Sequence, residues 1–521
     1  MLKKLLISVM ALITAVGMMN VSAAYVPEFS VWDGSIDTSW AENYDSDSIF
    51  TIETAAQLAG LRNLVWEGKN FANKLIRLNA NIDLNNLNWK YGIGGRKDSS
   101  WGENTNLQFK GEIRGNGYII KNLSINPNLS DASEESGNNV SDDVLGQNIC
   151  YGFLGYTSSG TVGGINLENV SVTFPNTQKD MLYQIGGLAG FTADTVYSAC
   201  TVKNIKFCGG WFAYADTPCD LNIGGLIGDM NSGTVNNCYT NGVDYTTMKN
   251  GRINSRAYKS GLLCVSTSSP TINNSYAVNM KYDRDGKTEL WTDYWQYNTR
   301  NFDTFVYCRK NGDSSYHTFK TNGKVYTDNY DHRREEDLVS GAEDKATAAV
   351  FGENFDFAPA LKGEGDNANT VYTMIDLSEY GIKYPVTGAE KIFAVKPVFY
   401  SNGAEIDKLE DAGSDLTVKF KSYNTTGQAQ SFDLIEAGYT DGKLADVHKE
   451  SVSLSKNVPV TEPGRWEQWQ PYVYGKTAEE LAVSQETEGE VSAKTDGINA
   501  LKVFCWESLE SQQPIALEIL K

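Results

Sequence analysis

Small, apolar and polar residues recur in the same order in four stretches of the chain. These stretches are residues 151–172, 185–207, 223–245 and 260–282. The third copy begins IGGLIGDMNSGTVNNCYTNG, and each of the other copies keeps a version of this order. Equivalent glycines lie 35, 38 and 36 residues apart, a period typical of solenoids, in which one copy stacks on the next.

Each copy alternates apolar and polar residues over short runs bounded by Gly, Ser and Asn, which predicts strands joined by turns. Such strands bury their apolar faces by pairing with equivalent strands of neighbouring copies, about 4.8 Å away. Repeated glycines suit sharp corners with positive φ, and repeated asparagines suit ladders of side-chain amides. The period leaves open whether one copy is one coil or two compact coils. The glycines given this structural role are Gly152, Gly155, Gly187, Gly190, Gly225, Gly228 and Gly261.

The segment before the repeats predicts a helix followed by strands. Thr54 and Gln57 form a capping box, and apolar residues with helical spacing follow, so we expect a helix over residues 55–66. Residues 75–86 alternate with period two and predict one strand, and residues 109–125 predict two more around a Gly-Asn-Gly turn. Because exposed strand edges promote aggregation, we expect the helix to cover the open end of the solenoid.

The entry segment and the repeats together resemble bacterial surface proteins with GLUG repeats. The resemblance rests on VWDGSIDTSW, TIETAAQLAGLRNLV, IRLNANIDL and FKGEIRGNGYIIKNL, and on the repeat cores GFLG, GLAG, GLIG and GLLC. It covers roughly residues 30–285 and implies a right-handed parallel β-helix of the pectin-lyase-like type. It also implies an exported bacterial protein, often modular and adhesin-like. Some proteins with these repeats are metallopeptidases, but this chain has no HExxH motif.

Beyond residue 391 the pattern changes to strand-like runs separated by turns, which suggests a β-sandwich. Phe420, Tyr423, the turn at 439–444 and the run at 502–507 resemble C-terminal β-sandwich modules of secreted proteins from clostridia-like bacteria. Those modules are accessory modules of poorly defined role. The resemblance therefore implies location more than chemistry.

The N-terminus has the pattern of a secretory signal. Lys3 and Lys4 precede an apolar run over residues 5–17 that is too short for a comfortable membrane span, and small residues end it near Ala23. No later stretch is long and apolar enough to be transmembrane, so we expect a secreted or cell-surface protein. The expected organisation is all-β, with a signal peptide at 1–24, a GLUG-type parallel β-helix with an N-terminal capping helix at 25–370, and an Ig-like β-sandwich module at 390–521.

The formal net charge of −20 over 521 residues argues against nucleic-acid binding, which needs clustered Lys and Arg. The eight cysteines include no CxxC pair, so we expect no zinc site. Cys208 and Cys219 flank one apparent loop and could pair, whereas buried free thiols are expected elsewhere. Cys238 occupies a repeat column with Cys200 and no neighbouring base, which favours a packing role.

Candidate catalytic groups are few, and we assign no catalytic residue, metal or cofactor. No helix pattern and no suitably placed Lys follow the repeated glycines, which argues against a phosphate loop. The histidines are only His317, His332 and His448, and no GxSxG elbow is present. Two Asp at residues 283–286 fall short of a calcium loop. An acid pair across a groove cannot be read from sequence.

Two aromatic clusters are the remaining surface signal. Trp291, Tyr294 and Trp295 lie in one polar stretch, and Trp466 and Trp469 lie in another. Flat apolar rings with polar rims suit contact with an extracellular glycan or with a host or surface protein. We therefore favour a non-catalytic binding, adhesin-like or structural protein. The alternative is a lyase or glycoside hydrolase that uses carboxylates on the lateral face of the β-helix.

Overall fold

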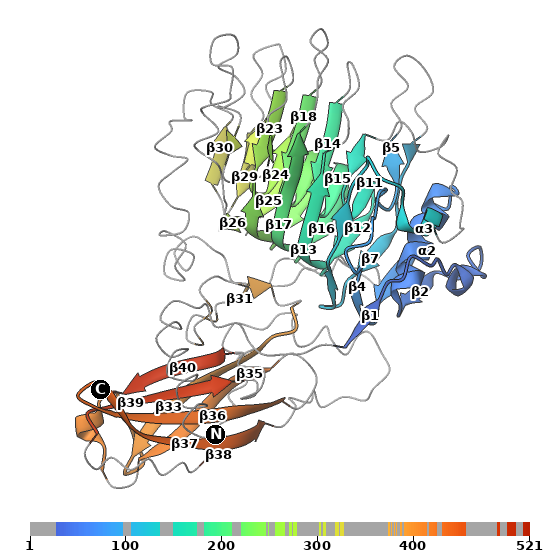
Figure 1. The fold of residues 1–521 in the computed structure, drawn as a ribbon. Coiled ribbons are helices and arrows are strands. Elements are labelled where there is room, and N and C mark those ends of the chain that lie inside the picture. Colours follow the sequence, from blue (N-terminus) through green and yellow to red (C-terminus); the bar gives the residue numbers. More distant parts are fainter. Residues whose placement is uncertain are drawn as a thin grey trace.

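The protein is mostly β: a parallel β-solenoid of about four turns is followed by small antiparallel sheets (Figure 1). The architecture is described here from a computed structural model. The residues that the structure describes are 28–96, 106–135, 149–174, 182–210, 220–245, 248–249, 256–265, 270–273, 275–278, 302–303, 306–308, 318–321, 324–327, 374–375, 377, 380, 382, 386–387, 390–413, 416–424, 430–454, 487–489, 498–506 and 514–520.

One sequence copy forms one coil. Leu154 pairs with Ala189, Ala189 with Ile227, and Ile227 with Leu263, so the coils are 35, 38 and 36 residues apart. These are the steps of the sequence repeat. The strands of the four coils are β10 (Cys150–Tyr151), β11 (Leu154–Ser158), β12 (Thr161–Gly163) and β13 (Asn166–Thr173); β14 (Leu182–Gly186), β15 (Ala189–Ala193), β16 (Thr195–Ser198) and β17 (Thr201–Gly210); β18 (Asp220–Gly224), β19 (Ile227–Met230), β20 (Gly233–Asn236) and β21 (Tyr239–Asp244); and β23 (Arg256–Ser260), β24 (Leu263–Val265), β25 (Thr271–Asn273) and β26 (Tyr276–Val278).

Equivalent strands of successive coils form parallel sheets. A nine-stranded sheet runs β1-β4-β8-β13-β17-β21-β26 with β9 and β22 beside it, and a seven-stranded sheet runs β2-β3-β7-β12-β16-β20-β25. Two five-stranded sheets run β10-β14-β18-β23-β27 and β11-β15-β19-β24-β28. The further strands are β1 (Phe29–Val31), β2 (Ile49–Ile52), β3 (Leu75–Leu78), β4 (Asn81–Asp83), β7 (Glu112–Arg114), β8 (Ile119–Lys121), β9 (Ser124–Ile125), β22 (Met248–Lys249), β27 (Phe302–Asp303) and β28 (Val306–Cys308).

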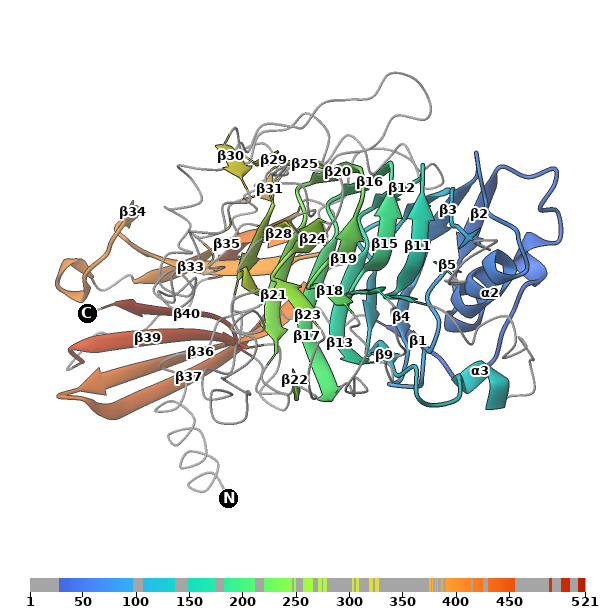
Figure 2. The ribbon, with the colours of Figure 1, turned by 90° about the horizontal axis from the view of Figure 1, so that it is seen from above.

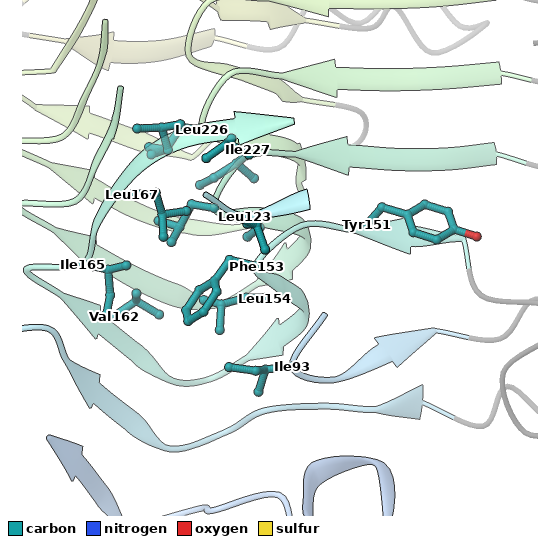
Figure 3. Packing of buried hydrophobic residues seen from close by; sticks show 14 of the residues in the cluster. Ile93, Leu123, Tyr151, Phe153, Leu154, Val162, Ile165, Leu167, Leu226 and Ile227 are labelled. Atoms are coloured by element: carbon teal, nitrogen blue, oxygen red, sulfur yellow. The ribbon is translucent and has the colours of Figure 1, made fainter. Parts of the chain in front are cut away.

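Stacked apolar side chains fill the interior of the coils (Figure 3). Val162, Ile165 and Leu167 come from one coil, Leu226 and Ile227 come from a later one, and all five are fully buried. Full burial of such a side chain contributes about 1.5–3 kcal/mol relative to exposure. The repeated apolar positions therefore hold the stack together.

The repeated glycines allow close approach of backbones. Gly152, Gly187, Gly225 and Gly261 lie at corners between strands of different sheets, as expected, but the expectation of positive φ is wrong. A Cβ added at Gly155 would lie 2.0 Å from the carbonyl oxygen of Gly94, and one at Gly228 would lie 2.3 Å from the nitrogen of Ile185. At Gly155 the backbone of β11 meets that of Gly94, and at Gly228 the backbone of β19 meets that of β14, so only glycine fits at these points. None of the set Gly152, Gly155, Gly187, Gly190, Gly225, Gly228 and Gly261 is among the glycines with positive φ.

A second difference concerns the alignment of the first two copies. Tyr151 pairs with Ile185, a step of 34 residues, whereas the step is 35 residues further along the same copy. Gly152 therefore faces Gly186 rather than Gly187, and its added Cβ would lie 2.9 Å from the oxygen of Gly186. Between these paired positions the first copy has two residues and the second has three.

Positive φ recurs at one position inside the strands β13, β17 and β21, where asparagine is common. Asn169, Asn204 and Gly242 occupy equivalent places in three coils, with φ of 55°, 55° and 81°. Asparagine tolerates this conformation better than most residues because its short side chain bonds locally. The amide of Asn204 also donates to Oδ1 of Asn169 at 3.4 Å, which is one step of the expected ladder.

The predicted helix is present as α2 (Ala55–Trp66). Oγ1 of Thr54 accepts a hydrogen bond from the Gln57 backbone at 3.2 Å, while Oε1 of Gln57 accepts one from the Glu53 backbone at 2.8 Å. In a capping box the second side chain accepts from the backbone of the N-cap residue itself; here Gln57 accepts from Glu53, the residue before the N-cap. Figure 2 shows α2 at the N-terminal end of the stack, beside β2, and its Leu58 and Leu61 join the solenoid core.

A buried ion pair fixes the entry segment. Nη1 and Nη2 of Arg62 lie 2.8 and 2.9 Å from the two carboxylate oxygens of Asp131, and the guanidinium lies 4.1 Å from the centre of the Trp89 ring. Burial alone would raise the pKa of Asp131, but the charge of Arg62 and hydrogen bonds from Ser133 hold it below its usual value. The pair links α2 to the start of α3 (Ala132–Glu135).

The single strand expected over residues 75–86 is two strands, β3 and β4, which lie in different sheets. Period-two alternation does not reveal a corner when inward apolar residues continue on both sides of it. The two strands expected around the Gly-Asn-Gly turn are β7 and β8, with φ of 52° at Asn116 and 75° at Gly117. They too lie in different sheets, so this turn is a corner of the solenoid and no hairpin.

The C-terminal strands form two four-stranded antiparallel sheets, β34-β33-β35-β38 and β37-β36-β39-β40. One apolar cluster takes Val418 and Phe420 from the first sheet and Phe432, Leu434 and Val503 from the second. The strands are β33 (Phe393–Ser401), β34 (Ala404–Glu405), β35 (Thr417–Asn424), β36 (Gln430–Thr440), β37 (Lys443–Leu454), β38 (Thr487–Gly489), β39 (Ala500–Trp506) and β40 (Pro514–Leu520).

Candidate functional site

The outward face of the nine-stranded sheet carries a ladder of alternating charge. Along the stack, Asp83 pairs with Lys121, Lys121 with Glu168, and Glu168 with Lys203, and Asn241 follows. Nζ of Lys121 lies 3.4 Å from a carboxylate oxygen of Asp83, and Nζ of Lys203 lies 3.8 Å from one of Glu168. We call these five residues the charge ladder.

The charge ladder is not arranged as the acid pair of a glycosidase. Each of its two carboxylates pairs with a lysine, and Lys121 lies on the rung between them. A glycosidase instead needs two carboxyl groups that face the same bond from opposite sides. The ladder presents a strip of both signs on the outer side of a sheet, with the exposed Asn169 and Asn204 next to it.

Glu390, from the segment that precedes β33, meets the end of this ladder. Its carboxylate pairs with Nζ of Lys203 and accepts hydrogen bonds from the Tyr239 hydroxyl at 2.7 Å and from the Thr387 backbone at 3.1 Å. Burial alone would lower the pKa of Lys203, but the charges of Glu390 and Glu168 raise it above its usual value. Glu390 is only 6% exposed and the Lys203 side chain is 28% exposed, so this is a partly buried, charge-assisted contact.

A hollow lies near α2. It measures about 250 Å³ and is open to solvent. Its lining includes Val65, Asn70, Gln108 and Lys110, so it contains one basic group and no carboxylate. These residues do not form an acid–base pair.

The predicted aromatic contacts cannot be placed. Trp291, Tyr294, Trp295, Trp466 and Trp469 all lie outside the described residues. The same holds for the turn at 283–286, for Cys219 and for two of the three histidines. His448 is described, and it is exposed on β37.

The cysteine column is a packing column of the solenoid. Cys200 and Cys238 are fully buried free thiols on adjacent coils, and the Cys200 backbone donates to Sγ of Cys238 at 3.3 Å. Burial raises the pKa of the Cys238 thiol well above its usual value, and the neighbouring Cys200 adds to this effect. A thiol of high pKa is a poor nucleophile, which agrees with the packing role expected from the sequence.

Three buried polar side chains of the five-stranded sheets form a second network. Oδ2 of Asp229 accepts hydrogen bonds from Gln184 at 3.1 Å and from Asn222 at 3.0 Å. All three residues are at most 1% exposed, so no ligand reaches them. The network joins the two sheets where the repeated glycines let them meet. Within the described chain, no group of three or more His, Cys, Asp or Glu side chains is arranged to hold a metal ion.

Sequence reasoning missed the charge ladder and Glu390. A sequence feature could have revealed the ladder, because Glu168 and Lys203 occupy the same position in consecutive copies and carry opposite charges. No sequence feature points to Glu390, because it lies 187 residues from Lys203 in the chain and outside the repeats.

These features define a β-solenoid protein with a charged lateral face and a second, antiparallel region joined to it. Comparisons with protein-family models, with curated proteins and with solved structures gave no match to this chain. Over the described residues, no helix has the length and apolar character needed to cross a membrane.

Proposed function

We propose that this chain is an exported, non-catalytic binding protein, adhesin-like or structural, that acts in the medium or at a bacterial surface. The observation that carries the proposal is the charge ladder, in which Asp83 and Glu168 are each paired with a lysine. Such a face offers complementary charges along an extended line, which gives specificity toward an extended partner. An extracellular glycan or a host or surface protein is the partner class.

The same proposal assigns a structural family to each of the two regions. We assign the solenoid to right-handed β-helices of the pectin-lyase-like type with GLUG repeats. Supporting this assignment, each Gly-Leu-apolar-Gly copy makes one coil. We assign residues 390–521 to an Ig-like accessory sandwich of clostridial type, which the apolar cluster common to both antiparallel sheets supports. The N-terminal charged and apolar segment supports export.

A glycan array and a panel of extracellular proteins, probed with the mature chain, test the binding function. Lys121→Glu reverses the middle charge of the ladder and should weaken capture of the true partner by about tenfold or more. Lys408→Glu is the matched control, because Lys408 is exposed on the C-terminal region and far from the ladder in sequence. Equal effects of the two variants, or the absence of any partner, would count against the charge ladder as the binding face.

The alternative, a lyase or glycoside hydrolase, requires an acid pair or an acid with a basic residue on adjacent coils. The ladder has residues of the second kind, since Lys121 lies between Asp83 and Glu168 on adjacent coils, but both of these carboxylates are ion-paired with lysines. Incubation with a panel of acidic and neutral polysaccharides separates the two functions. New reducing ends or unsaturated uronates, produced by wild type and lost with Glu168→Gln, would establish the enzyme.

A further inference from the structure

One outward column of the nine-stranded sheet is buried. Side chains alternate along a strand, and Val202 points into the core, so its neighbours Thr201 and Lys203 point outward. Thr201 pairs with Asn166 on one side and with Tyr239 on the other. These three residues are 0%, 2% and 2% exposed, although they lie on the outer side of the sheet.

Two consecutive residues of the segment before β33 reach both ends of this column. Glu390 holds the Tyr239 hydroxyl and the Lys203 ammonium at one end. At the other end, Nζ of Lys391 lies 3.2 Å from the centre of the ring of Tyr118, which directly precedes β8. The covered strands β13 and β17 lie between these contacts in the sheet order.

The same segment is anchored in the C-terminal sheets. Val386 belongs to a buried apolar cluster with Ala394 of β33 and Tyr423 of β35, and Ile392 packs against that cluster. Apolar side chains therefore hold the segment to the antiparallel region, while Glu390 and Lys391 hold it to the solenoid. The two regions meet through a short strip of chain with buried charge.

We propose that Val386, Thr387, Glu390 and Lys391 belong to a strap, held closed by Glu390 on Lys203 and Tyr239, which docks the C-terminal sheets on the lateral face. The closed strap covers the column of Asn166, Thr201 and Tyr239 and holds Lys203 of the charge ladder. Asp83, Lys121 and Glu168 remain the accessible part of that face. The inference does not depend on the proposed function, because it concerns a contact within the chain. Opening the strap uncovers a polar, aromatic surface that is buried in the closed form.

One buried group opposes closure. Oγ1 of Thr387 is buried without a hydrogen-bond partner, although the backbone nitrogen of the same residue donates to Glu390. A buried hydroxyl without a partner carries its full desolvation cost. Thr387→Val keeps the shape and removes that cost, so it should favour the closed form.

The test measures opening in the full-length chain by the rate of trypsin cleavage after Lys391 and by the radius of gyration from small-angle X-ray scattering. Glu390→Gln removes the charge that Lys203 requires and should raise the cleavage rate by about tenfold and increase the radius. Lys203→Met should do the same from the solenoid side. Thr387→Val should lower the cleavage rate below that of wild type.

Glu410→Gln is the matched control, since Glu410 is an exposed residue of the C-terminal region paired only with the exposed Lys408. It should leave both readouts unchanged. The strap proposal is overturned if trypsin cleaves Glu390→Gln and Lys203→Met at the wild-type rate. It is also overturned if Glu410→Gln is cleaved as fast as these two variants. Should Glu390→Gln fail to fold, an unchanged or faster cleavage of Thr387→Val overturns it as well.

Discussion

The solenoid and the C-terminal sheets both depend on glycine, but for different physical reasons. At Gly228 of the solenoid an added Cβ would lie 2.3 Å from backbone nitrogen, whereas at Gly442 of the β36–β37 turn nothing lies within 4 Å. Gly442 has φ of +76° and Gly228 does not have positive φ. Space is therefore limiting in the solenoid, and backbone conformation is limiting in the hairpin.

The contrast reflects how each region is stabilised. In the solenoid, each coil rests on equivalent positions of the next, so one blocked contact prevents two layers from meeting. In the hairpin, the strands are joined by the short turn at Asp441 and Gly442, and a strained turn still allows the strands to pair. The same substitution should thus have very different effects in the two regions.

The largest expected effect is that of Gly228→Ala. The new methyl group would clash with backbone atoms that cannot move without displacing β14, so we expect a loss above about 4 kcal/mol, enough to unfold the solenoid. Gly442→Ala, its counterpart, should cost only about 1–2 kcal/mol through its left-handed conformation. Calorimetry of both variants checks the comparison, and similar losses would contradict it.

The next effect is a pH dependence confined to the C-terminal sheets. Burial, with the nearby charges of Glu450 and Asp446, raises the pKa of Glu436 to about 7 from 4.5. The neutral form is therefore the stable one in the fold. Its contribution is complete below pH 4.5 and is lost as the pH rises through about 7.

Glu436→Gln should remove this dependence and stabilise the C-terminal sheets at pH 8 by about 2–3 kcal/mol relative to wild type. Denaturant unfolding at pH 5 and pH 8 measures it. Glu450→Gln serves as the control, because it removes only one of the two repelling charges and should give a smaller change. A wild-type protein equally stable at both pH values would refute the assignment.

A smaller effect is expected at the helix cap. Thr54→Ala removes the oxygen that accepts the Gln57 backbone hydrogen bond and should lower solenoid stability by about 1 kcal/mol. Thr54→Ser keeps that oxygen and should behave like wild type. Thermal unfolding of the pair decides whether the cap matters to the stack, and equal melting temperatures for both variants would show that it does not.

The smallest effect is expected on the charge ladder. Lys121→Met breaks a partly exposed ion pair with Asp83, and such pairs contribute at most about 1 kcal/mol. Stability should change little and should depend weakly on salt. A loss of several kcal/mol in thermal unfolding would mean that the ladder serves the fold more than a partner.

Much of the solenoid could be predicted from the sequence because its information is local and repeated. The period gave the coil spacing, the Thr54–Gln57 pair gave the start of α2, and the aligned small residues placed Cys200 and Cys238 in one inward column. The corner inside residues 75–86 was missed because inward apolar residues continue on both sides of it. The positive φ expected at the repeated glycines was wrong for a similar reason, since sequence cannot tell whether a glycine is needed for its φ or for a close backbone approach.

What the sequence determined by itself is periodicity: which residues recur, at what spacing, and hence that coils stack in parallel. What only the tertiary structure decided is which distant groups meet. Gly228 of one five-stranded sheet lies against the backbone of Ile185 in the other. Glu390, which follows the repeats in the chain, pairs with Lys203 inside them. A repeat fixes neighbours one period apart, because hydrogen bonding along the stack enforces that step. Contacts between layers and between regions depend on how the coils close in space, and no spacing in the chain encodes them.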